Sequence, residues 1–404
     1  MDPLDEVAAL VAHKGRAPGT DAERRAAKGL EARLRDMGRE ARLEPIEVRA
    51  SWTLTHLIHA LAGVVGTVLS VSSPLPATAL LLLVAASAYG DLTGGFQLAR
   101  RMTPRRASQN VVSREDGGRP GTLVLVAHYD AGRGGAVFGW RLADRGFEAF
   151  FWSLVVLLAC SALRLLGIDA TAVTAVQFLA TVALIVAVPL LADVGLSGVS
   201  PGANDNASGV ATVLRLAERY GGDLDHFDVW VVLTGAEEGM ELGMRAWLRA
   251  HGRRLHPDRT AFVCVDQVGA GTVRYARREG YLLQSRHNPT LVELCGQIAE
   301  EDAGDDGRYG AREYTARFAT DAYAARVAGF PAVSVSCLGA RDVAPHHHRE
   351  SDTVENLDPD ALERAFGFCS ELIELIDERI GPELDDEPAA SRRRWSAVRR
   401  RRGR

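Results

Sequence analysis

The stretch Thr122-Leu-Val-Leu-Val-Ala127, followed directly by His128-Tyr-Asp130, decides the fold of this chain. A short, continuous apolar run of this kind is typical of a strand that is buried on both faces of a sheet. Comparable runs alternate with helical patterns further along the chain. The strand-like runs are 227–234, 261–265 and 332–337, and the helical segments are 210–220, 242–250, 291–301 and 360–380. This alternation predicts a three-layer α/β/α sandwich with a mostly parallel central sheet.

The predicted α/β domain begins near the N-terminus. Residues 4–40 carry apolar positions among charges, as one or two amphipathic helices would, and 43–48 alternates like a strand. Ser208 is expected to cap the helix at 210–220. We expect the domain to comprise residues 1–50, 93–146 and 196–380, interrupted by insertions at 51–92 and 147–195 and followed by a tail at 381–404.

Both predicted insertions are strongly apolar. Residues 51–90 contain no Asp, Glu, Lys or Arg, and Ser72-Ser-Pro-Leu-Pro76 divides them into halves of roughly 18 residues, about the minimum for a membrane-spanning helix. A second pair follows at 149–166 and 171–191, with Arg164 placed where it can snorkel to the interface. The sequence therefore predicts two transmembrane hairpins. Buried helical hairpins in the core or at a dimer interface are the alternative.

The distribution of arginines predicts how these spans are oriented. Basic residues flank the spans on the side of the 91–148 segment, whereas the two short inter-helix turns carry only Arg164. By the positive-inside rule, the N-terminus, residues 91–148 and everything after 195 lie in the cytoplasm. We thus expect a four-span cell-membrane protein with its α/β domain on the cytoplasmic side.

Composition narrows the classes of partner. The 404 residues carry a net charge of −5 with a pI near 6.2, which gives no reason to expect nucleic acid. Five scattered cysteines without a CxxC pair fit a reducing compartment, and Met1–Glu6 does not resemble a secretory signal. The arginine-rich tail after 381 is expected to be a solvated, disordered end, or to be attracted to anionic lipid.

Five short motifs carry the chemistry, and four of them directly follow a strand-like run. They are Val126-Ala-His-Tyr-Asp130, Gly202-Ala-Asn-Asp-Asn-Ala-Ser-Gly209, Gly235-Ala-Glu-Glu-Gly239, Cys264-Val-Asp266 and His346-His-His-Arg-Glu-Ser-Asp-Thr353. The carboxyl ends of strands form the ligand crevice of open α/β sheets, so residues far apart in sequence can converge there. Histidines with several carboxylates form the mixed ligand set that zinc prefers, and an extra Glu beside a ligand Glu can accept a proton from a metal-bound water.

With these motifs, roughly over 110–375 outside the second hairpin and including Arg16-Ala-Pro-Gly-Thr20, the chain resembles the M28 family of co-catalytic zinc exopeptidases. The resemblance implies a zinc-exopeptidase-like fold and two zinc ions, with other divalent metals as an alternative. It implies that His128 and Asp266 bind one zinc, that Glu238 and His348 bind the other, that Asp205 bridges both, and that Glu237 is the general base. His348 is chosen within its run because Asp352 follows it by four residues, as in the family pattern, while His346 and His347 remain candidates. The resemblance also implies a cis Asp205–Asn206 peptide bond.

Elementary chemistry gives roles that fit this set. A bridging carboxylate can hold two metals about 3.5–4 Å apart, which together activate a shared water. Glu237 is free to take the proton, since neighbouring side chains at a strand end point apart. Asp130, two residues after His128, lies on the same side of an extended chain and could accept the other imidazole N–H. A loop-capping carboxylate is the alternative for Asp130.

Two departures from the family pattern concern the substrate. Asp205 follows His128 by 77 positions (205 − 128), because the second hairpin lies between them. The rim of the site should therefore lie close to the bilayer, where a short peptide or a membrane-derived amide would arrive. Thr320-Asp-Ala322 stands where many relatives have Ser-Asp-His, which bears on the specificity pocket.

The function predicted from sequence is that of a membrane-bound dizinc aminopeptidase acting on peptides or aminoacyl amides, in contact with membrane lipid and not with nucleic acid. Alternatives are a single-zinc amide hydrolase, a glutaminyl-cyclase-like acyltransferase, and a non-catalytic membrane scaffold of the same fold. No GxSxG motif is present, and no Cys lies beside a candidate His, so serine and thiol mechanisms have little support. The sequence leaves the oligomeric state open.

Overall fold

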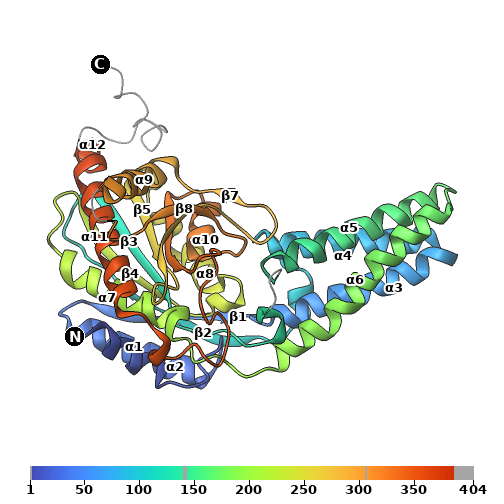
Figure 1. Ribbon diagram of the computed structural model, residues 1–404, viewed down its shortest axis with the longest axis horizontal. Coiled ribbons are helices and arrows are strands. Elements are labelled where there is room, and N and C mark those ends of the chain that lie inside the picture. The colour runs from blue at the N-terminus through green and yellow to red at the C-terminus, as the bar shows by residue number, and fades with distance from the viewer. Residues whose placement is uncertain (1, 140–142, 305–306, 386–404) are drawn as a thin grey trace, which may run out of the picture.

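A computed structural model describes residues 2–139, 143–304 and 307–385; the predicted tail lies largely outside them, from 386 on. An α/β domain forms one part, and four long helices project from its side as a bundle (Figure 1). The strands, in chain order, are β1 (Ala41–Val48), β2 (Arg106–Ser113), β3 (Gly121–His128), β4 (Phe227–Thr234), β5 (Thr260–Val265), β6 (Thr272–Glu279), β7 (Ser285–Arg286), β8 (Arg312–Thr315) and β9 (Ala332–Leu338).

These strands form one sheet in the order β1-β2-β4-β3-β5-β9-β6-β7, with β8 paired to β6. The pairs β4–β3, β3–β5 and β5–β9 are parallel, whereas β1–β2, β2–β4, β6–β9 and β6–β7 are antiparallel. The β6–β8 pair is also parallel. The expectation of a mostly parallel sheet is therefore right for the centre, and it is wrong for most of the flanking pairs. An alternation of strands and helices reveals the parallel βαβ units, but it carries no signal for the direction of strands joined without a helix.

Helices cover both faces of the sheet. The helices of the α/β domain are α1 (Pro3–Val11), α2 (Asp21–Asp36), α7 (Ser208–Tyr220), α8 (Leu242–His251), α9 (Pro289–Gly304), α10 (Asp321–Val327), α11 (Pro359–Ile380) and α12 (Pro382–Asp385). The first face packs against α1, α2, α7, α9 and α11, and the second against α8 and α10. The domain is thus an α/β/α sandwich.

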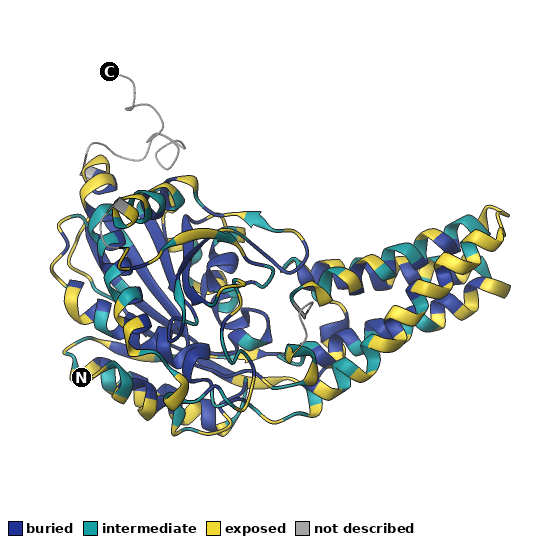
Figure 2. Ribbon diagram, in the orientation of Figure 1, coloured by how far each residue is buried: buried dark blue, intermediate teal, exposed yellow. Residues whose placement is uncertain are grey.

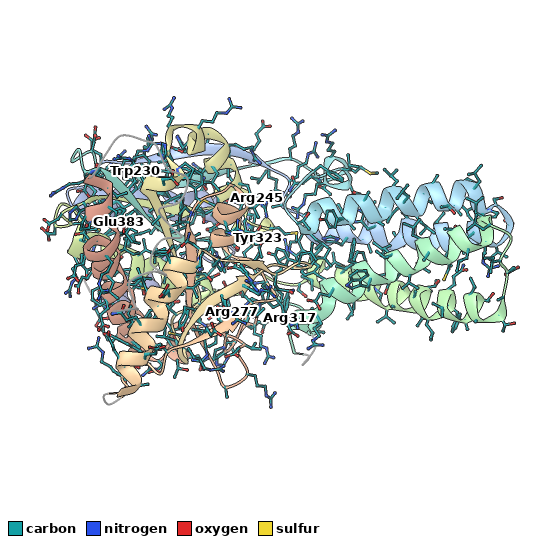
Figure 3. The ribbon with its side chains drawn as sticks, turned by 90° about the horizontal axis from the view of Figure 1, so that it is seen from above. Trp230, Arg245, Arg277, Arg317, Tyr323 and Glu383 are labelled. Carbon is teal, nitrogen blue, oxygen red and sulfur yellow. The ribbon has the colours of Figure 1, made fainter. Side chains whose placement is uncertain are left out.

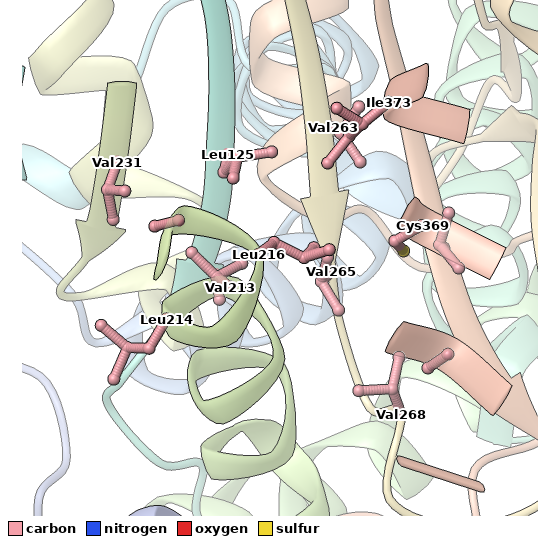
Figure 4. Close-up of a cluster of buried hydrophobic side chains, with 14 of the residues drawn as sticks. Leu125, Val213, Leu214, Leu216, Val231, Val263, Val265, Val268, Cys369 and Ile373 are labelled. Carbon is pink, nitrogen blue, oxygen red and sulfur yellow. The ribbon is translucent and has the colours of Figure 1, made fainter. Parts of the chain in front are cut away.

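The central strand shows why the opening stretch decides this fold. Leu123 and Leu125 point into the core beneath α7 and α11, and Val124 and Val126 point into the core beneath α8 and α10. All four side chains are fully buried, as predicted for a strand covered on both faces (Figure 2). In the first core, side chains from β3, β4 and β5 meet those of α7 and α11 (Figure 4).

The helix at 210–220 is longer than predicted, and Ser208 is its first residue rather than its cap. The Ser208 hydroxyl donates to the carbonyl of Asn204 at 2.7 Å and accepts the N–H of Val268 at 3.0 Å. The predicted cap was wrong because a contact with the loop after β5, invisible in sequence, uses this side chain.

The two apolar segments form paired helices: α3 (Trp52–Ser72) with α4 (Pro74–Leu92), and α5 (Gly146–Leu165) with α6 (Thr171–Leu196). All four helices are long and apolar enough to cross a membrane. Small residues allow close packing inside the bundle, since a Cβ on Gly63 would lie 2.7 Å from Leu184. Polar contacts also face inward, and Gln177 Nε2 donates to Ser70 Oγ at 2.9 Å.

Large apolar side chains cover the outside of this bundle. Val68, Leu83, Phe178 and Leu179 are each 58–68% exposed. An apolar core with a few polar contacts inside and an apolar surface outside is not the arrangement of a water-soluble bundle, whose outer face is polar.

The second hairpin leaves and re-enters the α/β domain at a single narrow point. Arg133 and Val199 form an antiparallel bridge, the N–H of Gly134 donates to the carbonyl of Gly198 at 2.9 Å, and that of Ser200 donates to the carbonyl of Gly132 at 2.8 Å. The long insertion after His128 is therefore closed by backbone pairing beside the motif that precedes it.

Candidate metal site

The predicted site residues converge at the carboxyl ends of four adjacent parallel strands. His128 is the last residue of β3, Asp266 directly follows β5, and the 346–348 run lies in the loop after β9. Glu237 and Glu238 begin the short turn Glu237–Gly239 after β4. Parallel pairing in register places these ends side by side, and Asp205 reaches them from the turn before α7.

Asp205 lies at the centre of the cluster. Its Oδ1 is 3.3 Å from His128 Nε2, and its Oδ2 is 3.3 Å from His348 Nε2. His128 Nε2 is also 3.5 Å from Asp266 Oδ1, and His348 Nε2 is 3.0 Å from Glu238 Oε1. One carboxylate thus faces two separate groups, each made of a histidine and a second carboxylate.

Glu237 lies to one side of these two groups. Its Oε2 is 3.8 Å from His128 Nε2, and burial raises the pKa of its carboxyl group well above the usual range, with neighbouring carboxylates adding to the effect. A buried carboxyl group with a raised pKa is suited to hold and release protons.

The donor set fits divalent cations. Asp205 Oδ2 and Asp266 Oδ1 are buried, and although imidazole nitrogens lie 3.0 and 3.5 Å from them, neither oxygen accepts a hydrogen bond of good geometry among the described residues. Burial of several carboxylates together is costly unless positive charge accompanies them. Three triads each bring their ligand atoms within 4.8 Å of one another: His128, Asp205 and Asp266; Asp205, His347 and His348; and His128, Glu237 and Glu238. Mixed imidazole and carboxylate donors at this spacing suit zinc.

The protonation of the histidines reflects the same negative field. Burial alone would lower the pKa of His348, but the Glu238 and Asp205 carboxylates raise it to about 10. Burial likewise opposes ionisation of Asp205, yet the facing imidazoles of His128, His347 and His348 hold the pKa of its carboxyl group well below the usual range. The same negative field would also favour the binding of divalent cations.

Gly132 leaves the space that the second group needs. A Cβ at this position would clash with His348 Nε2 and would lie 2.6 Å from Glu238 Oε1. A larger residue at position 132 would therefore displace the ends of the His348 and Glu238 side chains from these positions.

Asp130 supports the turn that carries both glutamates. Its Oδ1 and Oδ2 accept the backbone N–H groups of Glu237 and Glu238, each at 3.1 Å. The expected contact with His128 is longer, at 3.6 Å between Nδ1 and Asp130 Oδ1. The Asp130 carboxylate thus positions the turn that carries Glu237 and Glu238. The spacing of residues within the motif that contains Asp130 could not indicate this contact, because the two motifs lie far apart in the sequence.

The loop that carries Asp205 is held from two sides. Asp352 accepts the backbone N–H of Asn204 at 2.7 Å and that of Asp205 at 3.1 Å. The buried guanidinium of Arg16 donates to the carbonyls of Tyr129, Pro201 and Gly202, at 2.8, 2.5 and 2.6 Å. The Asp205–Asn206 peptide bond is cis, as the family resemblance implied.

The three histidines of the 346–348 run occupy different places. His348 and His347 both face Asp205, with His347 Nδ1 at 3.0 Å from Oδ2, and their rings stack with centroids 4.0 Å apart. His346 turns away and pairs with Ser351 at 2.8 Å. His347 is therefore a second histidine within reach of the Asp205 carboxylate, and the spacing of the motif did not distinguish it from His348.

Glu23 is a supporting residue that sequence reasoning missed. Its side chain is fully buried and accepts the backbone N–H of Ala236 at 3.0 Å and the Ser108 hydroxyl at 2.7 Å. Burial, with the nearby Asp130 carboxylate, raises its pKa to about 8. In sequence, Glu23 is one charge among many on an amphipathic helix, so no signal marked it.

A cavity of about 340 Å³ opens onto the cluster. Its walls include Tyr281, Phe318 and Thr320, together with Trp52 and Phe147 from the helix bundle. Asp321, from the Thr320-Asp-Ala322 segment, lies just behind this wall and accepts the Thr234 hydroxyl at 2.5 Å, and burial raises its pKa to about 7. The labelled Arg317 lies between the α/β domain and the bundle (Figure 3).

Solved structures share this fold at low sequence identity. A glutaminyl cyclase from Fimbriiglobus ruber has a TM-score of 0.55 and 15% identity, covering 93% of this chain and 94% of its own. A Zn-dependent exopeptidase from Parabacteroides distasonis has a TM-score of 0.53 and 14% identity, covering 94% and 97%. A leucine aminopeptidase precursor from Bacteroides thetaiotaomicron has a TM-score of 0.51 and 14% identity, covering 92% and 95%.

A search of curated protein sequences gives no match. The model of peptidase family M28, in contrast, matches residues 188–373, which contain Asp205, Glu237, Glu238, Asp266 and His348. Residues 188–373, somewhat less than half of the chain, are thus similar to peptidase family M28, and the α/β domain shares its fold with the solved structures named above.

Proposed function

We propose that this chain is a membrane-embedded metallopeptidase of the aminopeptidase type, which hydrolyses the amide bond next to a free amino terminus. The observation that carries the proposal is the central position of Asp205, whose two oxygens face His128 and His348 separately. This arrangement supports two cation positions. His128 and Asp266 would hold the first cation, and Glu238 and His348 would hold the second. Asp205 would bind both cations. Two divalent cations, zinc by the donor set, would polarise the amide carbonyl and acidify a water molecule.

The remaining residues supply the proton transfer. Glu237 takes a proton from the attacking water and passes it to the leaving amine, which its burial beside His128 favours. Asp130 keeps Glu237 and Glu238 in place through their backbone N–H groups. The aromatic wall of the cavity excludes water from the reacting bond.

Glu237→Gln is the decisive variant. The amide keeps the shape of the side chain but cannot accept the proton, so kcat on aminoacyl coumarin amides should fall by about 10²–10⁴-fold. Zinc counted by native mass spectrometry should remain at two ions per chain. Equal activity of the variant and the unmodified protein would overturn the assignment of Glu237. If neither protein were active while both carried zinc, a non-catalytic scaffold would be favoured.

A cyclase activity is the second candidate, because glutaminyl cyclases are among the similar structures. The two functions differ in metal content and product. One tightly bound zinc and ring closure of an N-terminal glutaminyl peptide, without amide hydrolysis, would favour the cyclase. Two zinc ions and release of the N-terminal residue would favour the peptidase.

We also propose that α3–α6 span the bilayer and that the α/β domain lies in the cytoplasm. The apolar outer surface of the bundle and the arginines near its inner ends support this orientation. Its test uses introduced cysteines, since the five native ones are buried. Ile168→Cys, at the far turn, should react with an impermeant maleimide on intact cells. Arg101→Cys should react only after lysis, and the reverse pattern would contradict the orientation.

A further inference from the structure

A second, smaller cavity of about 130 Å³ adjoins the candidate site at the inner end of the helix bundle. Its wall includes Trp52 of α3, Phe147 and Phe150 of α5, and Ala187, Leu191 and Val194 of α6. We call this cavity the apolar annex. Its lining residues come from the parts of α3, α5 and α6 nearest to the α/β domain. Figure 1 shows where these helices leave that domain.

The apolar annex and the metal-site cavity share a wall. Trp52, Phe138, Phe147 and Phe318 line both of them. The ring of Phe138 meets that of His348 edge-on, with centroids 4.5 Å apart. A group bound at the candidate cation positions is therefore separated from the annex by a single layer of aromatic side chains.

The lining of the annex suits hydrocarbon. Among its described lining residues, His56 is the single titratable one, and both of its ring nitrogens face other side chains. His56 Nε2 lies 3.3 Å from Asp91 Oδ2 without forming a hydrogen bond, and its Nδ1 lies 3.3 Å from His59 Nδ1. A polar ligand would lose hydrogen bonds to water and find few partners among these side chains, so the annex discriminates against it.

Its size sets the length of chain that it can hold. An apolar protein cavity of roughly 150 Å³ accommodates benzene, so about 130 Å³ suits a group of about five or six carbons. Next to the annex, α6 exposes Ile185 and Val186 on the outer surface of the bundle, so lipid chains and the annex would lie close together in a membrane. A substrate anchored in the bilayer could thus reach the metal site without crossing water.

We propose that the apolar annex binds a linear hydrocarbon chain of the substrate, so that the preferred substrates are amides with an alkyl chain of about six carbons or more beside the scissile bond. This inference rests on the proposed amide hydrolysis and adds the substrate class to it. The chain would occupy the annex, and the amide would lie at the carboxyl ends of β3, β4 and β5.

Two series of substrates test the proposal with the full-length protein in lipid nanodiscs. One series varies the linear side chain of an α-amino acid coumarin amide from two to six carbons, and the other varies the alkyl amine of an alanyl alkylamide over the same range. In one series kcat/KM should rise by about fourfold per added methylene group. The responsive series identifies the side of the scissile bond that faces the annex. A flat response in both series overturns the proposal.

Filling the annex should remove this preference. Ala187→Phe places a ring in the annex, and the ratio of kcat/KM between six-carbon and two-carbon substrates should fall towards one. Ala183→Phe, one turn earlier on the exposed surface of α6, is the matched control and should keep the ratio of the unmodified protein. Leu191→Ala enlarges the annex and should move the highest kcat/KM to substrates with longer chains. This variant tests the proposal even if Ala187→Phe does not fold. An unchanged ratio in both annex variants overturns the proposal.

A binding measurement separates this inference from the proposed reaction. A bromoalkyl amine should quench Trp52 fluorescence saturably in the unmodified protein, and Trp52→Phe should lose that component. Quenching without hydrolysis of any amide would support the annex and contradict the peptidase. Hydrolysis of short amides without quenching or chain-length dependence would support the peptidase and contradict the binding of a hydrocarbon chain in the annex.

Discussion

The Asp130 carboxylate accepts the backbone N–H of Glu237 at 3.1 Å, although the two residues lie 107 positions apart. Its second oxygen accepts the N–H of Glu238 at the same distance. The side chain that follows strand β3 thereby fixes the turn that follows strand β4. The proposed proton acceptor and one proposed ligand depend on the same anchor.

The first prediction concerns this anchor. Asp130→Asn keeps the size of the side chain but presents an NH₂ group to one of the two N–H donors, so the turn should loosen. Loss of such supporting contacts around metal ligands typically costs 10–100-fold in metal affinity or activity. We expect kcat/KM to fall by about that factor, with zinc binding weakened in competition with a chelator. Asp116→Asn, at an exposed position, is the control and should change neither.

The second prediction concerns the space at Gly132. Gly132→Ala would push a Cβ against His348 Nε2 and the Glu238 carboxylate, which are proposed to share one cation. We expect the second zinc ion to be lost selectively, leaving about one per chain. Gly146→Ala meets no atom within 4 Å and is the matched control. Two retained ions in Gly132→Ala would show that His348 and Glu238 do not share a ligand position.

Residues that follow a buried strand could be predicted from the sequence, whereas residues that act through contacts between distant loops could not. Residues His128, Asp266 and the glutamate pair could be assigned because each follows a buried strand, and parallel strands share an edge. Arg16 and Asp352 lie in segments that the family resemblance marked, but their contacts with backbone groups of distant loops could not be read from the sequence. Glu23 acts in the same way and was not singled out. The direction of the flanking strands was missed for the same reason, since pairing partners are set by tertiary contacts. His347 is ambiguous because three consecutive histidines offer three registers for one pattern.

The third prediction concerns Arg16, which ties the loop after β3 to the loop that carries Asp205. Arg16→Met keeps much of the volume but leaves three buried carbonyl groups without this donor. Unsatisfied buried groups cost about 1–3 kcal/mol each, so the free energy of unfolding should fall by at least about 2 kcal/mol. Arg16→Lys should recover only part of the loss, because an ammonium group lacks the planar fork. Chemical denaturation of the detergent-solubilised protein measures both, and stability equal to that of the unmodified protein would contradict the role given to Arg16.

The fourth prediction concerns the joint between the bundle and the α/β domain. Arg100 pairs with Asp91 at 2.5 Å at the end of α4, and it donates to the carbonyl of Gly239 at 2.8 Å, next to the glutamate turn. Both side chains are buried, so removing one partner leaves an uncompensated charge. Asp91→Leu should therefore destabilise the protein by roughly 3–5 kcal/mol.

The double variant Asp91→Leu/Arg100→Met should recover most of this stability, because an apolar pair of similar volume often replaces a buried ion pair without loss. The double variant still lacks the contact with Gly239, so its kcat should stay below that of the unmodified protein while its melting temperature is restored. Arg101→Met, at the exposed neighbouring position, should leave both quantities unchanged. If the double variant recovered full activity together with stability, Arg100 would serve to anchor the bundle and would have no part in positioning Glu238.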